Sequence, residues 1–204
     1  MSNELVPCNN IEQNYQIERV EQLNPAAHTV NNNYYIGCKD GTSRIDTYFQ
    51  ALLQEIENGI KEDVFEALEY YQTKLDGTKG MEKKLIDGGF RHSRIQEATR
   101  FKEMYAKIAM QYDCYPSAQR IIHSLFARIK HEFDDSIFPL IEQHQPLSVV
   151  MSKIRERIVI PIRDMLEANG AHDTVLGFNE DHIYGMIYYL TGMCHLNWKD
   201  YDNV

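Results

Sequence analysis

The sequence lacks any apolar run that approaches the roughly 18 residues of a membrane-spanning helix. Its polar N-terminal stretch also lacks the apolar core of a secretory signal peptide. Both absences predict a soluble, cytoplasmic protein that makes no contact with a membrane. A chain of 204 residues is long enough for one well-buried core, and two independent domains are not expected.

Motifs for metals and nucleotides are missing as well. The four cysteines, Cys8, Cys38, Cys114 and Cys194, lie far apart and form no CxxC pair, so the usual spacing of a structural zinc site is absent. The glycine-containing stretch 76–80 lacks the Gly-Lys-Ser/Thr order of a phosphate-binding loop, and no strand precedes it. We therefore expect neither a bound metal nor a cofactor.

Basic residues are outnumbered, and the net charge of −9 argues against a nucleic-acid-binding role for this chain alone. The charge is uneven, because residues 78–107 carry eight bases and four acids, whereas residues 1–70 carry four bases and twelve acids. The basic stretch either neutralises the acidic parts within the fold or faces an acidic partner. A helical transcriptional regulator stays open as a reading, since a recognition helix would have Arg91, Arg94, Arg100, Lys102 and Lys107.

The chain divides into three parts. Residues 1–26 are polar and are expected to form a flexible lead; residues 27–41 hold a β-prone segment and a turn; residues 42–204 are expected to form a single helical domain. A lone strand needs an edge from another protein or from a second copy, so residues 27–37 are a candidate contact for a partner or a homo-oligomer. The candidate interaction residues are Val30, Tyr34, Tyr35 and Ile36.

Spacing of the apolar residues predicts an all-α fold, a compact multi-helix bundle with one β-like segment at its front. Ser43 followed by Asp46 has the spacing of a helix cap, and Pro139 and Pro161 predict kinks or breaks. The helices are expected at 43–58, 60–75, 81–86, 93–112, 116–140, 146–169 and 181–192.

Three histidines are candidates for chemistry. His123 and His131 lie eight residues apart on one expected helix, which is not the i, i+4 spacing of a helical metal pair. His195 follows Cys194 directly, but side chains of adjacent residues diverge and rarely form a catalytic pair. The sequence thus predicts no catalytic residues, and a small metal-dependent hydrolase or nuclease that uses His123, His131 or His195 is the alternative reading.

The closing segment 181–198 is either a structural anchor or a chemical site. It combines a short apolar helix, a glycine, a Cys-His pair and the only tryptophan. A straight helix places His182 roughly 15–18 Å from Cys194, which separates the two side chains. We therefore interpret the segment as an anchor, in which Gly192 turns the chain and Cys194 and Trp198 seal the end. The residues expected to face the core are Ile183, Met186, Ile187 and Leu190.

Residues 185–198 resemble the ending of the C-terminal domains of bacterial ABC-three component systems. Their sequence begins Gly-Met-Ile-Tyr-Tyr-Leu-Thr-Gly-Met-Cys-His and ends at the tryptophan. The blocks 30–35, 70–80 and 87–90 resemble the same pattern. This family implies a domain that usually follows an effector, often a nuclease, and links it to an SMC/RecN-like ABC ATPase and a middle component. The resemblance transfers no catalytic residues.

No stretch before residue 28 has the size of an effector. The sequence therefore predicts a non-enzymatic protein-interaction or adaptor module of a bacterial multi-component system, with a role in antiphage defence. Its expected partners are the ABC ATPase and the middle component, and the acidic N-terminal part is a second candidate contact surface.

Overall fold

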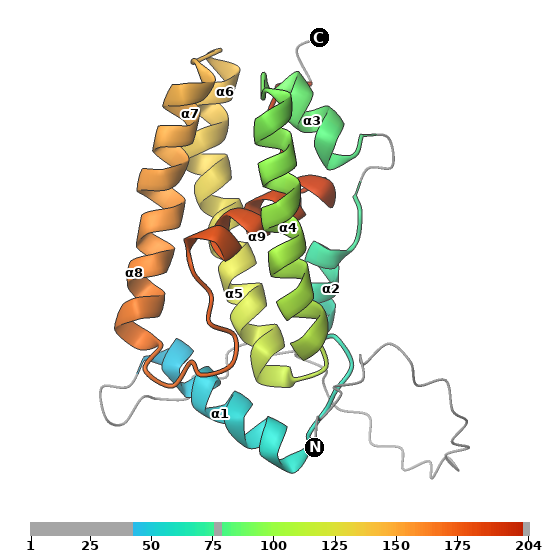
Figure 1. Cartoon of the computed structure of the whole chain (residues 1–204), viewed down its shortest axis with the longest axis vertical. Coiled ribbons are helices and arrows are strands. Elements are labelled where there is room, and N and C mark those ends of the chain that lie inside the picture. Colours follow the sequence, from blue (N-terminus) through green and yellow to red (C-terminus); the bar gives the residue numbers. More distant parts are fainter. Residues whose placement is uncertain (1–42, 76–78, 202–204) are drawn as a thin grey trace, which may run out of the picture.

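The computed structural model describes residues 43–75 and 79–201, and these residues form helices and turns without a strand. The all-α prediction is therefore confirmed for the described part. The predicted β-like segment lies outside the described residues, together with Val30, Tyr34, Tyr35 and Ile36. Figure 1 shows α3, α6 and α7 at one end of the bundle and α1 lying across the other. The elements are α1 (Arg44–Asn58), α2 (Glu66–Gln72), α3 (Met81–Asp87), α4 (His92–Tyr112), α5 (Pro116–Glu132), η1 (Phe133–Ile137), α6 (Phe138–Glu142), α7 (Leu147–Ile154), η2 (Arg155–Val159), α8 (Ile160–Asn169) and α9 (Glu180–Gly192).

The first helix begins as its sequence predicts. The Ser43 hydroxyl accepts the Asp46 N–H at 3.2 Å, and Gly59 ends the helix in the left-handed conformation at φ 64°. The next helix is shorter than predicted, because residues 60–65 form a loop and only Glu66–Gln72 is helical. The buried side chain of Gln119 holds this loop: it accepts the Phe65 N–H and donates to the Glu62 carbonyl.

Two long helices form an antiparallel hairpin, and each contains a π turn two residues before a proline. The π turn Phe133–Ile137 precedes Pro139, and Arg155–Val159 precedes Pro161. A proline has no N–H to donate and its ring presses on the carbonyl four residues back, and one wider turn accommodates both effects without ending the helix. The predicted kinks are therefore π turns. Arg157 in one π turn binds Glu132, which lies beside the other, at 2.8 Å.

The closing helix α9 crosses the bundle and packs mainly against α4 (Figure 1). Gly185 lies at this crossing, where a Cβ atom would stand 2.3 Å from the Phe101 carbonyl oxygen and 2.8 Å from Tyr105 Cβ. On the same helix, Ile183, Met186, Ile187 and Leu190 are fully buried. The absence of a side chain at Gly185 therefore sets how closely α9 approaches the rest of the core.

Gly185→Ala is expected to lower the free energy of unfolding by about 2 kcal/mol, because the new methyl group meets backbone that cannot move aside. Gly192→Ala is the matched control on the same helix, where the nearest atom to the new Cβ is Met81 Cβ at 3.7 Å. The control should be neutral or stabilising by up to about 1 kcal/mol. Urea unfolding of both variants measures the difference, and equal effects would contradict the close crossing.

Candidate interaction site

The residues after α9 fold back on the bundle as a C-terminal hook, which we define as residues 193–201. The reversal occurs at Cys194, which has φ 68°. Its N–H donates to the Thr191 carbonyl at 3.2 Å and the N–H of His195 donates to the Leu190 carbonyl at 2.9 Å, the pattern that usually ends a helix at a left-handed glycine. The expectation that Gly192 turns the chain is wrong: Gly192 is the last helical residue of α9.

Trp198 is the apolar centre of the hook and is 3% exposed. Its ring packs edge-on against Phe90 and Phe133, at centroid distances of 4.8 and 5.6 Å, and its indole N–H donates to the Thr191 hydroxyl at 3.0 Å. Gly88 lies so close that an added Cβ atom would be 2.6 Å from Trp198 Cβ. The glycine after α3 is therefore needed for the close approach of the hook.

Polar contacts fasten the same hook to α3. Lys84 is buried, and its ammonium donates to the Asn197 side-chain oxygen at 2.8 Å and to the Leu196 carbonyl at 3.4 Å. The Tyr201 hydroxyl donates to Asp87 at 3.0 Å. A hydrogen bond from Lys83 holds the pKa of the Asp87 carboxyl below its usual value, so this acceptor stays ionised.

The hook also reaches the end of α2, since the Leu75 N–H donates to the Met193 carbonyl at 3.2 Å. Described residues of three of the sequence blocks that carry the family resemblance, 70–80, 87–90 and 185–198, thus contribute to one region of the structure. The fourth block, 30–35, lies outside the described residues.

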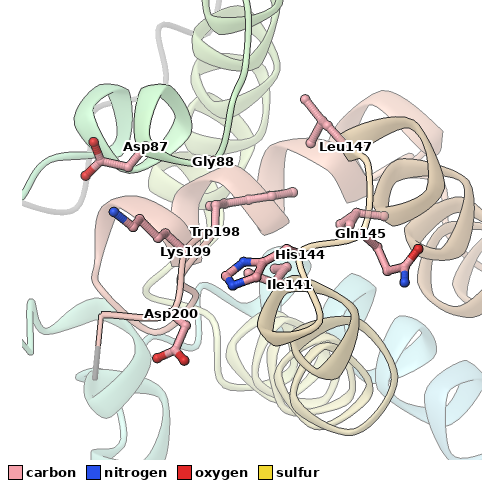
Figure 2. A pocket seen from close by; sticks show the side chains of 10 residues that line it. Asp87, Gly88, Ile141, His144, Gln145, Leu147, Trp198, Lys199 and Asp200 are labelled. Atoms are coloured by element: carbon pink, nitrogen blue, oxygen red, sulfur yellow. The ribbon is translucent and has the colours of Figure 1, made fainter. Parts of the chain in front are cut away.

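A cleft of about 210 Å³ opens beside Trp198, between the end of α3, the turn from α6 to α7 and the hook (Figure 2). In Figure 2 the Trp198 ring lies between Gly88 and the turn that carries His144. That turn also uses a left-handed residue, His144, at φ 53°. The lining residues are Asp87, Gly88, Ile141, His144, Gln145, Leu147, Val150, Trp198, Lys199 and Asp200.

The sequence-predicted histidines do not form an active-site set. The Tyr71 ring contacts both His195, at 5.3 Å, and His123, at 5.8 Å. His131 is exposed on α5. Within the described ranges, His123 and His195 form no ion pair with a carboxylate, and no three His, Cys, Asp or Glu side chains lie close enough to hold a metal ion.

His195 is 5% exposed, and neither of its ring nitrogens forms a hydrogen bond with another described residue. It packs against Tyr70 at 4.9 Å as well as against Tyr71. Burial lowers the pKa of His195, and backbone groups of Tyr70 and Thr73 oppose this shift only in part. The ring is therefore neutral at pH 7 and acts as a packing group of the hook.

The predicted anchor residues differ in their surroundings. Met186, Ile187 and Leu190 are fully buried on α9 and Trp198 is nearly so, whereas Cys194 is partly exposed, with its thiol 3.6 Å from the Lys79 carbonyl. Sequence reasoning missed Lys84, Gly88 and Tyr201. Of these three, only Gly88 has a signal in the sequence. It is followed directly by a second glycine, and a single glycine is enough to end a helix.

The described residues therefore define an all-helical domain that is closed by a C-terminal hook. Residues 80–198, more than half of the chain, match the model of C-terminal domain 9 of the ABC-three component (ABC-3C) systems. The chain belongs to this family, which confirms the resemblance seen in the sequence. No curated protein and no solved structure gives a significant match. None of the described helices is long and apolar enough to cross a membrane.

The free energy of unfolding is expected to fall as the pH is lowered from 7.5 to 5.5. Burial lowers the pKa values of His123, His182 and His195 from 6.5 in the folded protein, so the unfolded chain binds more protons in this window and gains stability from them. Urea unfolding at several pH values measures the slope. His195→Phe should reduce it, whereas replacement of the exposed His131 by Gln should not; an unchanged slope in His195→Phe contradicts the neutral buried ring.

Proposed function

We propose that this domain is a non-enzymatic adaptor of an ABC-three component system, which couples to an SMC/RecN-like ABC ATPase and a middle component in antiphage defence. Membership of the C-terminal domain family is the observation that carries the proposal, because it ties the chain to a system made of several proteins. The adaptor role, its two partners and the place in defence are our inference from that membership.

Exposed apolar side chains around the hook support a contact role. Six large apolar side chains of the described residues are exposed, and four of them neighbour the hook or the cleft. The Tyr70 ring packs at a tilt against His195, and the Leu75 N–H donates to the Met193 carbonyl. The remaining two of these four, Ile86 and Val149, are the sequence neighbours of Asp87 and Val150, which line the cleft. Tyr70 and Leu75, which are exposed beside the hook, are therefore candidates for contact with a protein partner.

Charge also favours a protein partner over nucleic acid. The chain carries 30 acidic and 21 basic residues, and the basic side chains of α7, η2 and α8 are largely committed to ion pairs within the fold. Arg155 and Arg163 both bind Glu180 at 2.7 Å, and Lys153 binds Glu156 at 2.9 Å. Paired cations release few counterions from a phosphate backbone.

Affinity purification of the full chain, co-expressed with an ABC ATPase and a middle component of the same system, tests the proposal. The ATPase should be recovered with the full chain, and recovery should fall at least tenfold when residues 27–37 are deleted. Deletion of residues 5–15, which removes the same number of residues from the lead, is the matched control and should leave recovery unchanged.

The rival reading as a hydrolase predicts a different result. A metal-dependent nuclease or nucleotidase activity of the purified chain that is lost in His131→Ala or in His195→Phe would contradict the adaptor proposal. Failure to recover either partner at micromolar concentrations of all three proteins would contradict it as well.

A further inference from the structure

The two long helices of the hairpin join in a tip beyond their π turns, which we define as residues 138–153. Figure 1 shows the tip, with α6 and α7, at the same end of the bundle as α3. Among the described elements, α6 packs mainly against η1, and α7 packs mainly against η1 and η2. Neither helix packs broadly against α3, α4 or α9. The tip is therefore held to the bundle chiefly through the π turns at its base.

Few buried side chains anchor the tip. Ile141 and Val150 are the only two of its residues that are buried, and both line the cleft beside Trp198. The other apolar side chains of the tip are half-buried or exposed. A segment with so few buried contacts moves at a lower cost in free energy than the helices of the core. A movement of the tip therefore separates mainly the two walls of the cleft.

The base of the tip contains a π turn in each of the two helices. Arg157 of η2 binds Glu132, which directly precedes η1, at 2.8 Å. Pro139 and Pro161 follow the two turns and have no N–H to donate, so each helix lacks a backbone hydrogen bond near the base of the tip. Helices bend sharply at prolines and at π turns, and both features occur here in both helices. The hairpin is therefore weakest at this base, and the ion pair couples the bending of its two helices.

The cleft of about 210 Å³ lies between the tip and the rest of the molecule (Figure 2). Half of its lining residues belong to the tip, and the other half belong to the end of α3 and to the hook. The lining residues of the tip are Ile141, His144, Gln145, Leu147 and Val150. A change in the angle of the tip therefore changes the width of the cleft.

Trp198 belongs to the wall that does not move with the tip. Its ring packs against Phe90 and Phe133, and its indole N–H donates to Thr191. None of these three residues lies in the tip. A swing of the tip therefore leaves Trp198 in place and uncovers the side of its ring that faces the cleft.

We propose that residues 138–153 are a hinged tip, which swings about the two π turns and so opens and closes the cleft beside Trp198. In such a motion a few residues absorb the change in backbone angles, and here they are those of η1 and η2. Opening uncovers an apolar interior made of Ile141, Val150 and Trp198, all of which are buried in the closed arrangement. The inference concerns the protein without a partner and does not depend on the adaptor function.

Distances across the cleft test the inference in the full-length protein. Ile86 and Val149 are 50% and 43% exposed and are sequence neighbours of lining residues on opposite walls. Spin labels attached there through a keto-bearing amino acid leave the native cysteines unaltered, and pulsed electron paramagnetic resonance measures the distribution of distances between the labels. A label pair at Gln96 and Gln111, both exposed on α4, gives the width that the labels alone produce. The pair across the cleft should be about twice as wide.

Two variants change the hinge in opposite directions. Pro139→Ala combined with Pro161→Ala restores an N–H donor in each helix and should narrow the distribution about twofold. Arg157→Gln removes the ion pair at the base of the tip and should broaden it. Lys153→Gln is the matched control for Arg157→Gln, because its pair with Glu156 joins neighbouring residues of one helix, and it should leave the width unchanged. Arg157 is exposed, so Arg157→Gln should fold and carries the test if the double variant does not.

The inference is overturned if the distribution across the cleft is no wider than that of the pair on α4, or if Arg157→Gln and Lys153→Gln give the same width. A double proline variant that folds and keeps the width of the unaltered protein would place the motion outside the π turns and contradict the inference as well.

Discussion

The fit of Trp198 between Gly88 and Thr191 is the contact on which the rest of the site depends. It joins the last described segment to α3, which also packs against α9 and α4. The indole N–H is satisfied by a buried hydroxyl, so the ring is placed by a hydrogen bond as well as by packing. With Trp198 in place, the Lys84 ammonium donates to Asn197 and the Asp87 carboxylate accepts from Tyr201, both in the hook. The Trp198 ring also forms one wall of the cleft.

A contact site at this end of the bundle combines rigid and adaptable parts. The two long helices are tied across their π turns by Arg157 and Glu132, whereas α3 is a helix of seven residues that packs against α9, α4 and the hook. Short helices fastened by a few contacts open more readily than the core does.

Helix positions could be predicted from the sequence where the signal is local. The Ser43 cap, the stop at Gly59 and the end of α3 all follow from neighbouring residues. Signals that depend on distant residues were missed. Residues 60–65 look helical but are held as a loop by Gln119, and Cys194 takes the left-handed position expected near Gly192. Lys84 would be predicted to face solvent, because only the folded hook brings Asn197 to its ammonium.

Hydrogen exchange of Trp198→Ala, compared with the unaltered protein, tests most directly whether the hook holds α3 and the cleft together. The substitution removes a buried aromatic side chain and should cost about 3 kcal/mol or more. The account predicts that amides of Met81–Asp87 and of residues 193–201 lose protection together, while amides of α1 and α5 keep more of theirs. Uniform loss across all helices, or full protection of α3, would contradict the central role of this contact.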